Sequence, residues 1–581
     1  MHIEDKLNNP SAFSWMKKPE SVNREQIDRI IDVDVAVIGA GQAGTCAARA
    51  ASEIEGTKVA LIEQQDEEKQ WILGVGEVGH INSKWQESQG IPKVDIDEFV
   101  NDWQLRTNNR SNYRLIRKYA EKCGECFDWL IEPLTDEERS VIYPRLKNPS
   151  PNMPKSLNGI KAWAGTAMMG VDVQNSAIKK SQQIVRDRGG ELLFNARAVE
   201  LIQEGNRVCG VIVQLSQTGD KNCGSKEKQI NNVSDSDRLD GKHRDDVTYV
   251  QINATKGVII AAGDYSQNRQ MCVDLLTESA DLVDNNSDWL GHGWDGSGIQ
   301  MGVWAGGRLE PRSHAAAGGN YSLPGFDVTG SAAVLRVNKH GKRYSNEGFG
   351  THILGALAGT KQPNGYLYGV FDSNIAEFLT YQTPCHAVID YCVEERMQTL
   401  GSQLKCAREA GKYGYEIGAV AGSENDETKR LRVLYSADTI EELANNVFEN
   451  EDDRSNFINE VKRYNELCHQ GKDTDFGKEA VLMQPIEKAP FYAMAQLKDS
   501  HHPIGQSFKL LVTVSGLLID ENGQVLDDEY EPIKGLFAAG NSSGCRFGYQ
   551  YSTSLPGQSI SMAQTLGRET GYYVAKLKDS D

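Results

Sequence analysis

Two apolar runs joined by a stretch of small residues form the clearest pattern in the chain. Residues 33–38 (VDVAVI) and 58–62 (KVALI) consist mainly of aliphatic side chains, which predicts two short buried strands. The alanine-rich residues 42–52 between them predict a helix. Glycines stand where the first strand meets this helix. We therefore predict a strand, a tight turn, a helix and a second strand over residues 33–63.

The same kind of pattern returns later in the chain. Helices are predicted over residues 97–132 and 171–188 and from Gln558. Short strands are predicted at residues 192–194, 198–202, 208–214, 249–252, 257–263, 517–520 and 535–539. Residues 306–500 differ in character, because they mix short strands with helices at 441–449 and 456–470. We interpret them as a second domain inserted into an α/β domain.

This interpretation divides the chain into four parts. They are an N-terminal arm (1–30), the first part of the α/β domain (31–305), the inserted domain (306–500) and the remainder of the α/β domain (501–581). Residues 218–246 are polar and charged, so we expect a solvated hairpin insertion there.

The first turn carries a nucleotide-binding pattern. Gly39, Gly41 and Gly44 follow the order G-x-G-x-x-G, which suits a tight turn, close approach to a pyrophosphate and close helix packing. Glu63 follows about twenty residues later, at a position where an acid accepts hydrogen bonds from ribose hydroxyls and repels a 2′-phosphate. FAD or NAD is therefore favoured over NADP. Residues 291–296 repeat the glycine spacing, but no buried strand precedes them, so we reject that copy.

Composition narrows the class of protein. The chain has 581 residues, enough for two to four domains, and its net charge of −19 argues against nucleic acid as a partner. Residues 1–19 contain no apolar core of a signal peptide, and no apolar run reaches the length of a membrane helix. We expect a cytoplasmic protein.

The eleven cysteines are scattered and odd in number, which favours a reducing compartment over a disulfide framework. Cys123 and Cys126 form a C-x-x-C within a predicted helix, without the following histidine of a haem attachment site or a second cysteine pair for zinc or an iron–sulfur cluster. They are either two small helix residues or a redox dithiol. No metal site is predicted.

Five segments in fixed order carry a family resemblance. They are the Gly39 fingerprint, residues 257–263, residues 341–347 (GKRYSNE), the pair His501 and His502, and residues 535–541. In this order the chain, from about residue 30 to its end, resembles the fumarate reductase/succinate dehydrogenase flavoprotein superfamily. More narrowly, it resembles the soluble fumarate reductase-like and 3-ketosteroid dehydrogenase branch.

The resemblance implies a fold and a chemistry. It implies an α/β architecture, with a Rossmann-like FAD-binding domain and an inserted α+β capping domain over the isoalloxazine. It also implies hydride exchange between flavin N5 and a C–C bond, with the protein orienting the substrate and supplying a proton.

Two departures from fumarate reductases disfavour a dicarboxylate substrate. Their proton-donating arginine has no counterpart in residues 370–377, and a serine replaces their carboxylate-binding arginine in the run 553–559. Residues 548–551 (GYQY), followed by Pro556 and Gly557, instead resemble the tyrosine segment of ketosteroid dehydrogenases, although about two residues are inserted. In that family a tyrosine hydroxyl polarises a ketone. The family's other catalytic tyrosine corresponds to Phe349.

The resemblance implies five candidate catalytic residues, each with a plainer alternative. Tyr551 would polarise the substrate or donate a proton, or else pack against the flavin domain. Arg546 would replace the missing cation, or else be a solvated loop residue. One histidine of the pair, His502 rather than His501, would contact substrate, unless both are structural. Arg343 more simply pairs with Glu347.

The predicted cofactor contacts come from the fingerprint, the strand ends and the C-terminal helix. They are Gly39, Ala40, Gly41, Gln42, Ala43, Gly44, Glu63, Gly79, His80, Ala198, Gly263, Asp295, Gly540, Asn541, Ser559 and Ile560. Ser559 and Ile560 would offer backbone N–H groups to the flavin pyrimidine. His80 lies further from Glu63 than the family's flavinylated histidine lies from its acid, so non-covalent FAD is expected.

The sequence thus favours an FAD-dependent enzyme that reduces an activated C=C bond, in an enone, an enoate or an aromatic-derived substrate of anaerobic metabolism. An external donor would supply electrons, for example reduced flavin, ferredoxin or an NADH-linked reductase, and an oligomer is compatible with the sequence. Two alternatives stay open. One is a 3-ketosteroid-type dehydrogenase running the reverse reaction, and the other is an electron-transfer flavoprotein subunit of a larger complex.

Overall fold

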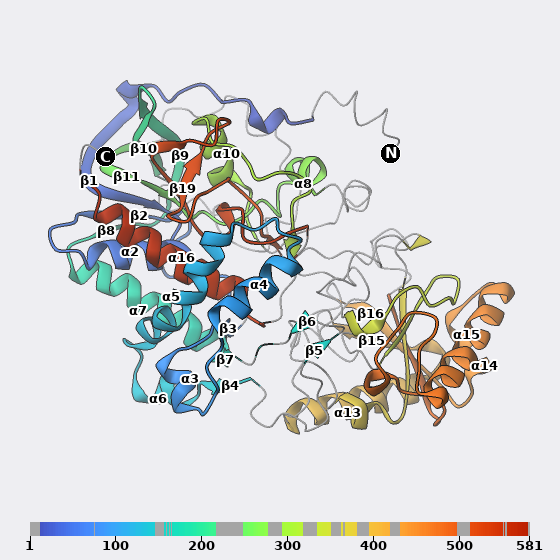
Figure 1. Cartoon of the computed structure of the whole chain (residues 1–581). Coiled ribbons are helices and arrows are strands. Elements are labelled where there is room, and N and C mark those ends of the chain that lie inside the picture. The colour runs from blue at the N-terminus through green and yellow to red at the C-terminus, as the bar shows by residue number, and fades with distance from the viewer. Residues whose placement is uncertain are drawn as a thin grey trace.

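The structure is a computed structural model. It describes residues 12–74, 76–145, 156–157, 160–161, 163, 165–215, 248–276, 293–317, 334–349, 362–363, 367–379, 394–418, 430–496, 512–549, 551 and 555–578. The predicted hairpin insertion at 218–246 and the pair His501 and His502 lie outside these residues. Figure 1 shows a larger body that carries both ends of the colour scale and a smaller one drawn in yellow and orange.

The larger body is built on an eight-stranded sheet in which residues from both ends of the chain meet. Strands β20, β11, β1, β2 and β8 are parallel to one another, and β19 pairs with β20 in the antiparallel sense. Strands β9, β10 and the first part of β11 form an antiparallel meander. The strands are β1 (Ile27–Ile38), β2 (Val59–Ile62), β8 (Glu191–Leu193), β9 (Ala196–Glu204), β10 (Arg207–Leu215), β11 (Thr248–Ile260), β19 (Gln524–Leu526) and β20 (Pro532–Ala538).

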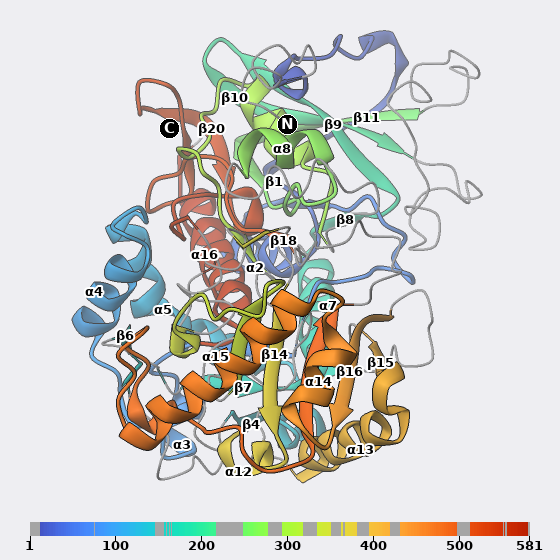
Figure 2. The ribbon, with the colours of Figure 1, turned by 90° about the vertical axis from the view of Figure 1, so that its right-hand side faces the viewer.

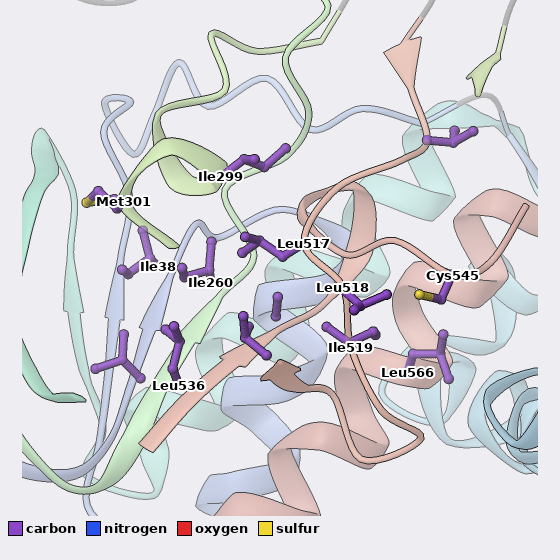
Figure 3. Packing of buried hydrophobic residues seen from close by; sticks show 14 of the residues in the cluster. Ile38, Ile260, Ile299, Met301, Leu517, Leu518, Ile519, Leu536, Cys545 and Leu566 are labelled. Atoms are coloured by element: carbon purple, nitrogen blue, oxygen red, sulfur yellow. The ribbon is translucent and has the colours of Figure 1, made fainter. Parts of the chain in front are cut away.

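Side chains of the central strand alternate between two buried faces, as the period of a strand requires. Val35 and Val37 pack with the alanine faces of α2 (Gln42–Ser52) and α16 (Gln558–Ala575). Ile38 belongs to the opposite core, together with residues of α10 (Ser297–Trp304) and Leu517. Figure 3 shows this second core, with Ile38, Ile260 and Leu536 on adjacent strands and Ile299 on the covering helix.

Helix α16 closes the first face by lying directly on α2. A Cβ on Gly567 would stand 2.4 Å from the carbonyl oxygen of Ala43, and one on Gly571 would stand 2.2 Å from that of Ala47. Two glycines one helical turn apart therefore let the backbones of the two helices touch. The Gln564 side chain also donates a buried hydrogen bond of 2.9 Å to Gln42, 522 residues away.

Further helices and small sheets surround this body. The helices are α3 (Lys84–Ser88), α4 (Ile96–Arg106), α5 (Tyr113–Ile131), α6 (Asp136–Ser140), α7 (Gly170–Asp187) and α8 (Arg269–Leu275). The short strands are β3 (Glu77–Gly79), β4 (Tyr143–Pro144), β5 (Ser156–Leu157), β6 (Ile160–Lys161), β7 (Thr166–Met168), β12 (Ala316–Ala317) and β18 (Val512–Thr513).

The smaller body is a five-stranded sheet in the order β13-β14-β17-β16-β15, with every neighbouring pair antiparallel. Its strands are β13 (Leu335–Asn338), β14 (Leu367–Asp372), β15 (Tyr415–Gly418), β16 (Arg430–Ala437) and β17 (Phe491–Gln496). Its helices are α12 (Ile375–Phe378), α13 (Glu394–Ala410), α14 (Ile440–Val447) and α15 (Glu451–Gln470), and Figure 2 shows α14 and α15 in front of the sheet. The architecture is thus a Rossmann-like domain with an α+β capping domain, as predicted.

Helices cover both faces of the capping sheet. Val433 and Ala493 pack with α14 and α15, whereas their neighbours Leu434 and Met494 pack with α13. The larger body also takes in part of the segment predicted as the cap, because β12 pairs with β18. The strands of the capping sheet begin only at Leu335, and the exact domain boundaries stay predictions.

Several predicted elements differ from those observed. The single helix over 97–132 is wrong: the chain breaks between α4 and α5, where Asn108 and Asn109 have φ values of 53° and 57° that end a helix. Strand β1 begins at Ile27, within the predicted arm, because its first half pairs with β11. Residues 517–520 make only isolated bridges and not a regular strand.

The cysteine pair sits inside α5, where both side chains are buried. Burial raises the pKa of each thiol, Cys123 and Cys126, to about 12, and the structure records both as free cysteines. A thiol with so high a pKa is a poor nucleophile, so the interpretation as two small helix residues is favoured over a redox dithiol. Among the described helices, none is both long and apolar enough to cross a membrane.

Candidate functional site

A cavity lies at the carboxyl ends of four neighbouring parallel strands, which is where open α/β sheets bind ligands. It holds about 1300 Å³, including the part open to solvent. Its walls follow β1, β2, β11 and β20 in turn, with Gly39, Glu63, Gly263 and Asn541 at the strand ends. Backbone hydrogen bonds from Gly39 to Ile62, from Ala261 to Ile38 and from Ala539 to Ile260 keep these ends level with one another.

The glycine turn leaves a recess in the cavity wall. A Cβ on Gly44 would stand 1.8 Å from the Gly39 carbonyl oxygen, so this position packs helix α2 against the turn. A Cβ on Gly41 would meet no atom within 4 Å, since this glycine faces the open cavity. Helix α2 begins there without a side-chain cap, which leaves its first-turn N–H groups and its dipole directed at the recess.

Glu63 is held in place beside this turn. Its two carboxylate oxygens accept hydrogen bonds from the backbone N–H groups of Ala40 and Gln65, each at 2.9 Å. The side chain is buried and lines the cavity. Each carboxylate oxygen can accept a second hydrogen bond, so the arrangement suits a ribose diol.

Helix α16 begins at the other end of the cavity, after Gly557 at a φ of 74°. Ser559 and Ile560 both line the cavity. The N–H of Ser559 donates a hydrogen bond of 3.1 Å to the Tyr551 hydroxyl. The structure thus gives this N–H a partner other than the expected flavin pyrimidine, and the predicted flavin contact stays a prediction.

Tyr551 lines the cavity and is 3 % exposed. Its ring meets that of Phe547 edge to face at 5.0 Å between centroids. Burial raises the pKa of the Tyr551 hydroxyl, while the nearby Arg546 acts in the opposite direction. The hydroxyl therefore keeps its proton at neutral pH, as a hydrogen-bond donor or acid in the cavity must.

Arg546 is not a solvated loop residue, because none of its surface is exposed. Its guanidinium donates hydrogen bonds to the carbonyl oxygens of Ser543 and Val514 and to the side-chain oxygen of Asn541, which itself lines the cavity. Its Nη1 has no partner within the described residues. Burial lowers the pKa of Arg546 to about 10, so the side chain stays charged at neutral pH.

Two buried groups behind Arg546 were missed by sequence reasoning. Glu310 accepts a 2.6 Å hydrogen bond from the Cys545 N–H, and burial raises its pKa to about 7. His314 contacts the Tyr265 hydroxyl at 2.8 Å and the Glu310 carbonyl oxygen at 3.0 Å, and burial lowers its pKa to about 4. No local motif marks either residue, and Glu310 lies 235 positions from its partner Cys545.

Most of the predicted cofactor contacts fall on the cavity wall. Those that line it are Gly39, Gly41, Gln42, Ala43, Glu63, Ala198, Gly263, Gly540, Asn541, Ser559 and Ile560. Three others have structural partners: Ala40 binds Glu63, Gly44 packs on the turn, and a Cβ on Gly79 would stand 2.2 Å from the Pro556 carbonyl oxygen.

The remaining predicted residues lie away from the wall. His80 is buried, stacks on Phe127 at 3.9 Å and bonds Ser83, and burial lowers its pKa to about 3. Asp295 accepts from the Ser297 N–H and pairs with Arg197 at 2.7 Å. Both residues have structural partners, and neither belongs to the cavity lining.

Arg343 lies in the capping domain, within a buried cluster of charges. Its guanidinium pairs with Glu347 and with Asp473, each at 2.8 Å. Lys478 completes the cluster 3.4 Å from Glu347, and burial lowers its pKa to about 8. The pairing with Glu347 is the one the sequence suggested. These ion pairs indicate a structural role for Arg343, which does not belong to the cavity lining.

The cavity fits FAD. Three features line it: a recess where Gly41 leaves room for phosphate, the Glu63 carboxylate that can bind a ribose, and the start of helix α16 beside Tyr551. Within the described part of the chain, no group of three or more His, Cys, Asp or Glu residues could hold a metal ion. The absence of a metal stays a prediction.

Comparisons with known proteins agree with this assignment. A family model described as an FAD binding domain matches residues 34–560. The chain is 23 % identical to a vinyl phenol reductase of Lactiplantibacillus plantarum over 94 % of its own length and 96 % of the relative. It is also 23 % identical to a probable fumarate reductase of Shewanella frigidimarina, over 98 % and 80 % of the two chains.

A solved structure shares the fold. The 3-ketosteroid-Δ4-(5α)-dehydrogenase of Rhodococcus jostii superposes with a TM-score of 0.62 and 19 % identity, over 97 % of this chain and all of that one.

Proposed function

Because the chain belongs to the FAD binding domain family and is an FAD-dependent oxidoreductase acting on C=C bonds, we propose that it works as a reductase of an activated C=C bond. The substrate would be a small enone, enoate or aromatic-derived alkene. The observation that carries this proposal is the buried, protonated Tyr551 on the wall of the FAD cavity, next to a buried arginine.

The FAD would be held by residues already described. The start of α2 receives the pyrophosphate, Glu63 binds a ribose, and the start of α16 with Asn541 borders the flavin end. When bound, FAD supplies the hydride exchange with the substrate carbon.

Tyr551 would polarise the group conjugated to the double bond. Its oxygen accepts a hydrogen bond from the Ser559 N–H, which fixes the hydroxyl in place, and a hydroxyl that accepts one bond can still donate its proton. Negative charge that develops on a substrate carbonyl is stabilised by such a donor in a site shielded from water. Arg546 would add a fixed positive charge behind it, because it remains protonated at neutral pH.

A dicarboxylate such as fumarate is a poor candidate. Residues 370–377 contain no arginine, and Asp372 in this stretch accepts hydrogen bonds from the backbone N–H groups of Glu487 and Lys488. This segment therefore has a structural task in the capping domain. A bidentate clamp for a second carboxylate would need another arginine.

The reverse reaction is the second candidate. The fold is shared with a ketosteroid dehydrogenase, and a tyrosine that polarises a ketone suits either direction of the reaction.

A reductase of this kind needs an external electron donor that reduces the flavin. We propose a reduced flavin, a ferredoxin or an NADH-linked reductase as the donor in a cytoplasmic setting.

Direct reoxidation of the flavin tests the proposal. The holoenzyme is reduced with dithionite without oxygen and mixed with enones, enoates and vinyl phenols, and the flavin absorbance is followed. We expect rapid reoxidation by at least one of these alkenes. If saturated ketones instead bleach the oxidised flavin and no alkene reoxidises the reduced flavin, the dehydrogenase hypothesis replaces the reductase hypothesis.

The Tyr551→Phe variant tests the proposed role of the hydroxyl. Loss of a general acid or electrophile costs about 10²–10⁴-fold in rate, while flavin content should stay full because the ring remains. The control is Tyr549→Phe, since Tyr549 is exposed and lies outside the cavity lining. Unchanged turnover in Tyr551→Phe would remove Tyr551 from the mechanism.

A further inference from the structure

Two tryptophans lie together at one end of the cavity, and no sequence motif indicates their role. Trp71 and Trp294 both line the cavity, and their ring centroids lie 6.1 Å apart at an interplanar angle of 56°. They come from loops more than two hundred residues apart in the sequence. Together they form one aromatic wall, which we call the tryptophan pair.

The tryptophan pair is tied to the strand ends by specific hydrogen bonds. The Gln65 side chain bonds both the N–H and the carbonyl oxygen of Trp71, at 2.9 Å and 3.1 Å, and the Gln65 N–H in turn bonds Glu63. The backbone N–H of Trp294 donates a hydrogen bond of 2.7 Å to the buried Asp264 carboxylate. The backbone of each tryptophan is therefore held at a strand end, that of Trp71 beside the ribose-binding acid and that of Trp294 at the end of β11.

The backbone beneath Trp294 is shaped to receive its ring. A Cβ on Gly263 would stand 2.1 Å from Cδ1 of that indole, and Gly263 has a φ of 84°. Only a glycine leaves this space and adopts this conformation without strain. The Trp294 part of the aromatic wall therefore depends on the glycine at the end of β11.

The order of the strands decides which half of FAD meets the wall. Glu63 and Gln65 follow β2, whereas Asn541 follows β20, three strands further along the sheet. Neighbouring strands lie about 4.8 Å apart, so the two ends of the cavity are separated by roughly 14 Å. Trp71 lies beside the ribose-binding acid through Gln65, and Trp294 precedes Asp295, which pairs with Arg197 next to the residue whose N–H bonds the Glu63 carbonyl oxygen. The tryptophan pair therefore belongs to the ribose end, and Tyr551 to the flavin end.

We infer that the tryptophan pair is the contact surface for the adenine ring of FAD and makes the protein selective for the dinucleotide over FMN. A flat, largely apolar base gains dispersion and stacking energy against an indole. FMN has no adenine and gains nothing from this wall. The inference rests on the FAD cofactor and is independent of the substrate proposed for the enzyme.

Ligand affinities of the deflavinated full-length protein test the inference. Trp71→Ala and Trp294→Ala are compared with the parent protein for binding of FAD, FMN and ADP, the last of which carries the adenosine half alone. We expect FAD and ADP to bind about tenfold more weakly in each variant. FMN binding should stay within about twofold, and Trp71→Phe should restore most of the FAD affinity.

Trp304→Ala is the matched control, because Trp304 is half-buried, bonds Trp15 and lies outside the cavity lining. It should leave all three affinities unchanged. Two results would overturn the inference. One is an equal loss of FAD and FMN affinity in the Trp71 and Trp294 variants that far-UV circular dichroism shows to be folded. The other is unchanged ADP binding in both variants.

Discussion

The two largest sheets in the described part of the protein are stabilised by different kinds of contact. The sheet of the FAD-binding domain has small residues and glycines at the ends of its parallel strands, where backbone approaches backbone and leaves a cavity. The capping sheet is antiparallel and has helices on both faces. The capping domain also contains a buried cluster of charged side chains, which are Arg343, Glu347, Asp473 and Lys478. The first region is built by close contact, and the second depends on matched charges.

The strongest test of this contrast concerns close contact. Gly44→Ala places a Cβ 1.8 Å from the Gly39 carbonyl oxygen, so helix α2 must move away from the turn. We expect a loss of at least about 4 kcal/mol in the free energy of unfolding and almost complete loss of bound FAD. Flavin content after purification and thermal unfolding measure both effects.

Gly41→Ala is the matched control, because its Cβ would meet no atom within 4 Å. The fold should persist, while FAD binds more weakly because the methyl group occupies the recess. If both variants lose the same stability, close packing at the turn is not what distinguishes Gly44.

The second test concerns the charges of the cap. Glu347→Gln removes the carboxylate that pairs with both Arg343 and Lys478, and removing one partner of a buried ionic cluster costs about 3 kcal/mol. We expect the cap to become sensitive to limited proteolysis while the protein keeps its flavin. Glu487→Gln should cost less than about 0.5 kcal/mol, since its partner His469 is exposed. Parallel loss of flavin and cap in Glu347→Gln would show that the two regions unfold as one.

The third test concerns a buried acid in the FAD-binding domain, where desolvation outweighs the hydrogen bonds and cations around the carboxyl group. Burial raises the pKa of Glu310 to about 7 from its ordinary value of about 4.5, so the folded state holds a proton that the unfolded state has lost between these pH values. The stability that this group contributes is present below about pH 4.5 and disappears as the pH rises through about 7.

Glu310→Gln should remove this dependence. We expect the difference in unfolding free energy between parent and variant to change by about 3 kcal/mol between pH 4.5 and 7.5, with the parent relatively weaker at the higher pH. Urea unfolding at several pH values measures it. A flat difference would mean that Glu310 titrates normally in the folded protein.

The cofactor site could be predicted from the sequence because its residues belong to local motifs. Gly39, Gly41 and Glu63 lie within a single strand, turn, helix and strand unit, and each has a fixed task at a fixed spacing. The Asn108–Asn109 break was missed although residues 106–112 (RTNNRSN) contain no apolar residue, and the left-handed backbone of the two asparagines follows the end of α4.

The parts that could not be predicted depend on contacts between distant segments. Glu310 meets Cys545, and Trp71 meets Trp294, through the tertiary fold alone. An isolated glutamate or tryptophan carries no signal of such a partner in the chain. The family order of segments indicated Tyr551, yet its hydrogen bond to the Ser559 N–H required the geometry of the start of α16.

The contact between α2 and α16 has a consequence for the timing of synthesis. Gln42 and Gln564 are 522 residues apart, and ribosomes add about 5–20 residues per second. The alanine face of α2 therefore waits roughly 25 to 100 seconds for the helix that covers it. During this interval the nascent chain exposes the apolar face of α2 that α16 covers in the folded protein. FAD can enter a finished site only after nearly the whole polypeptide has left the ribosome.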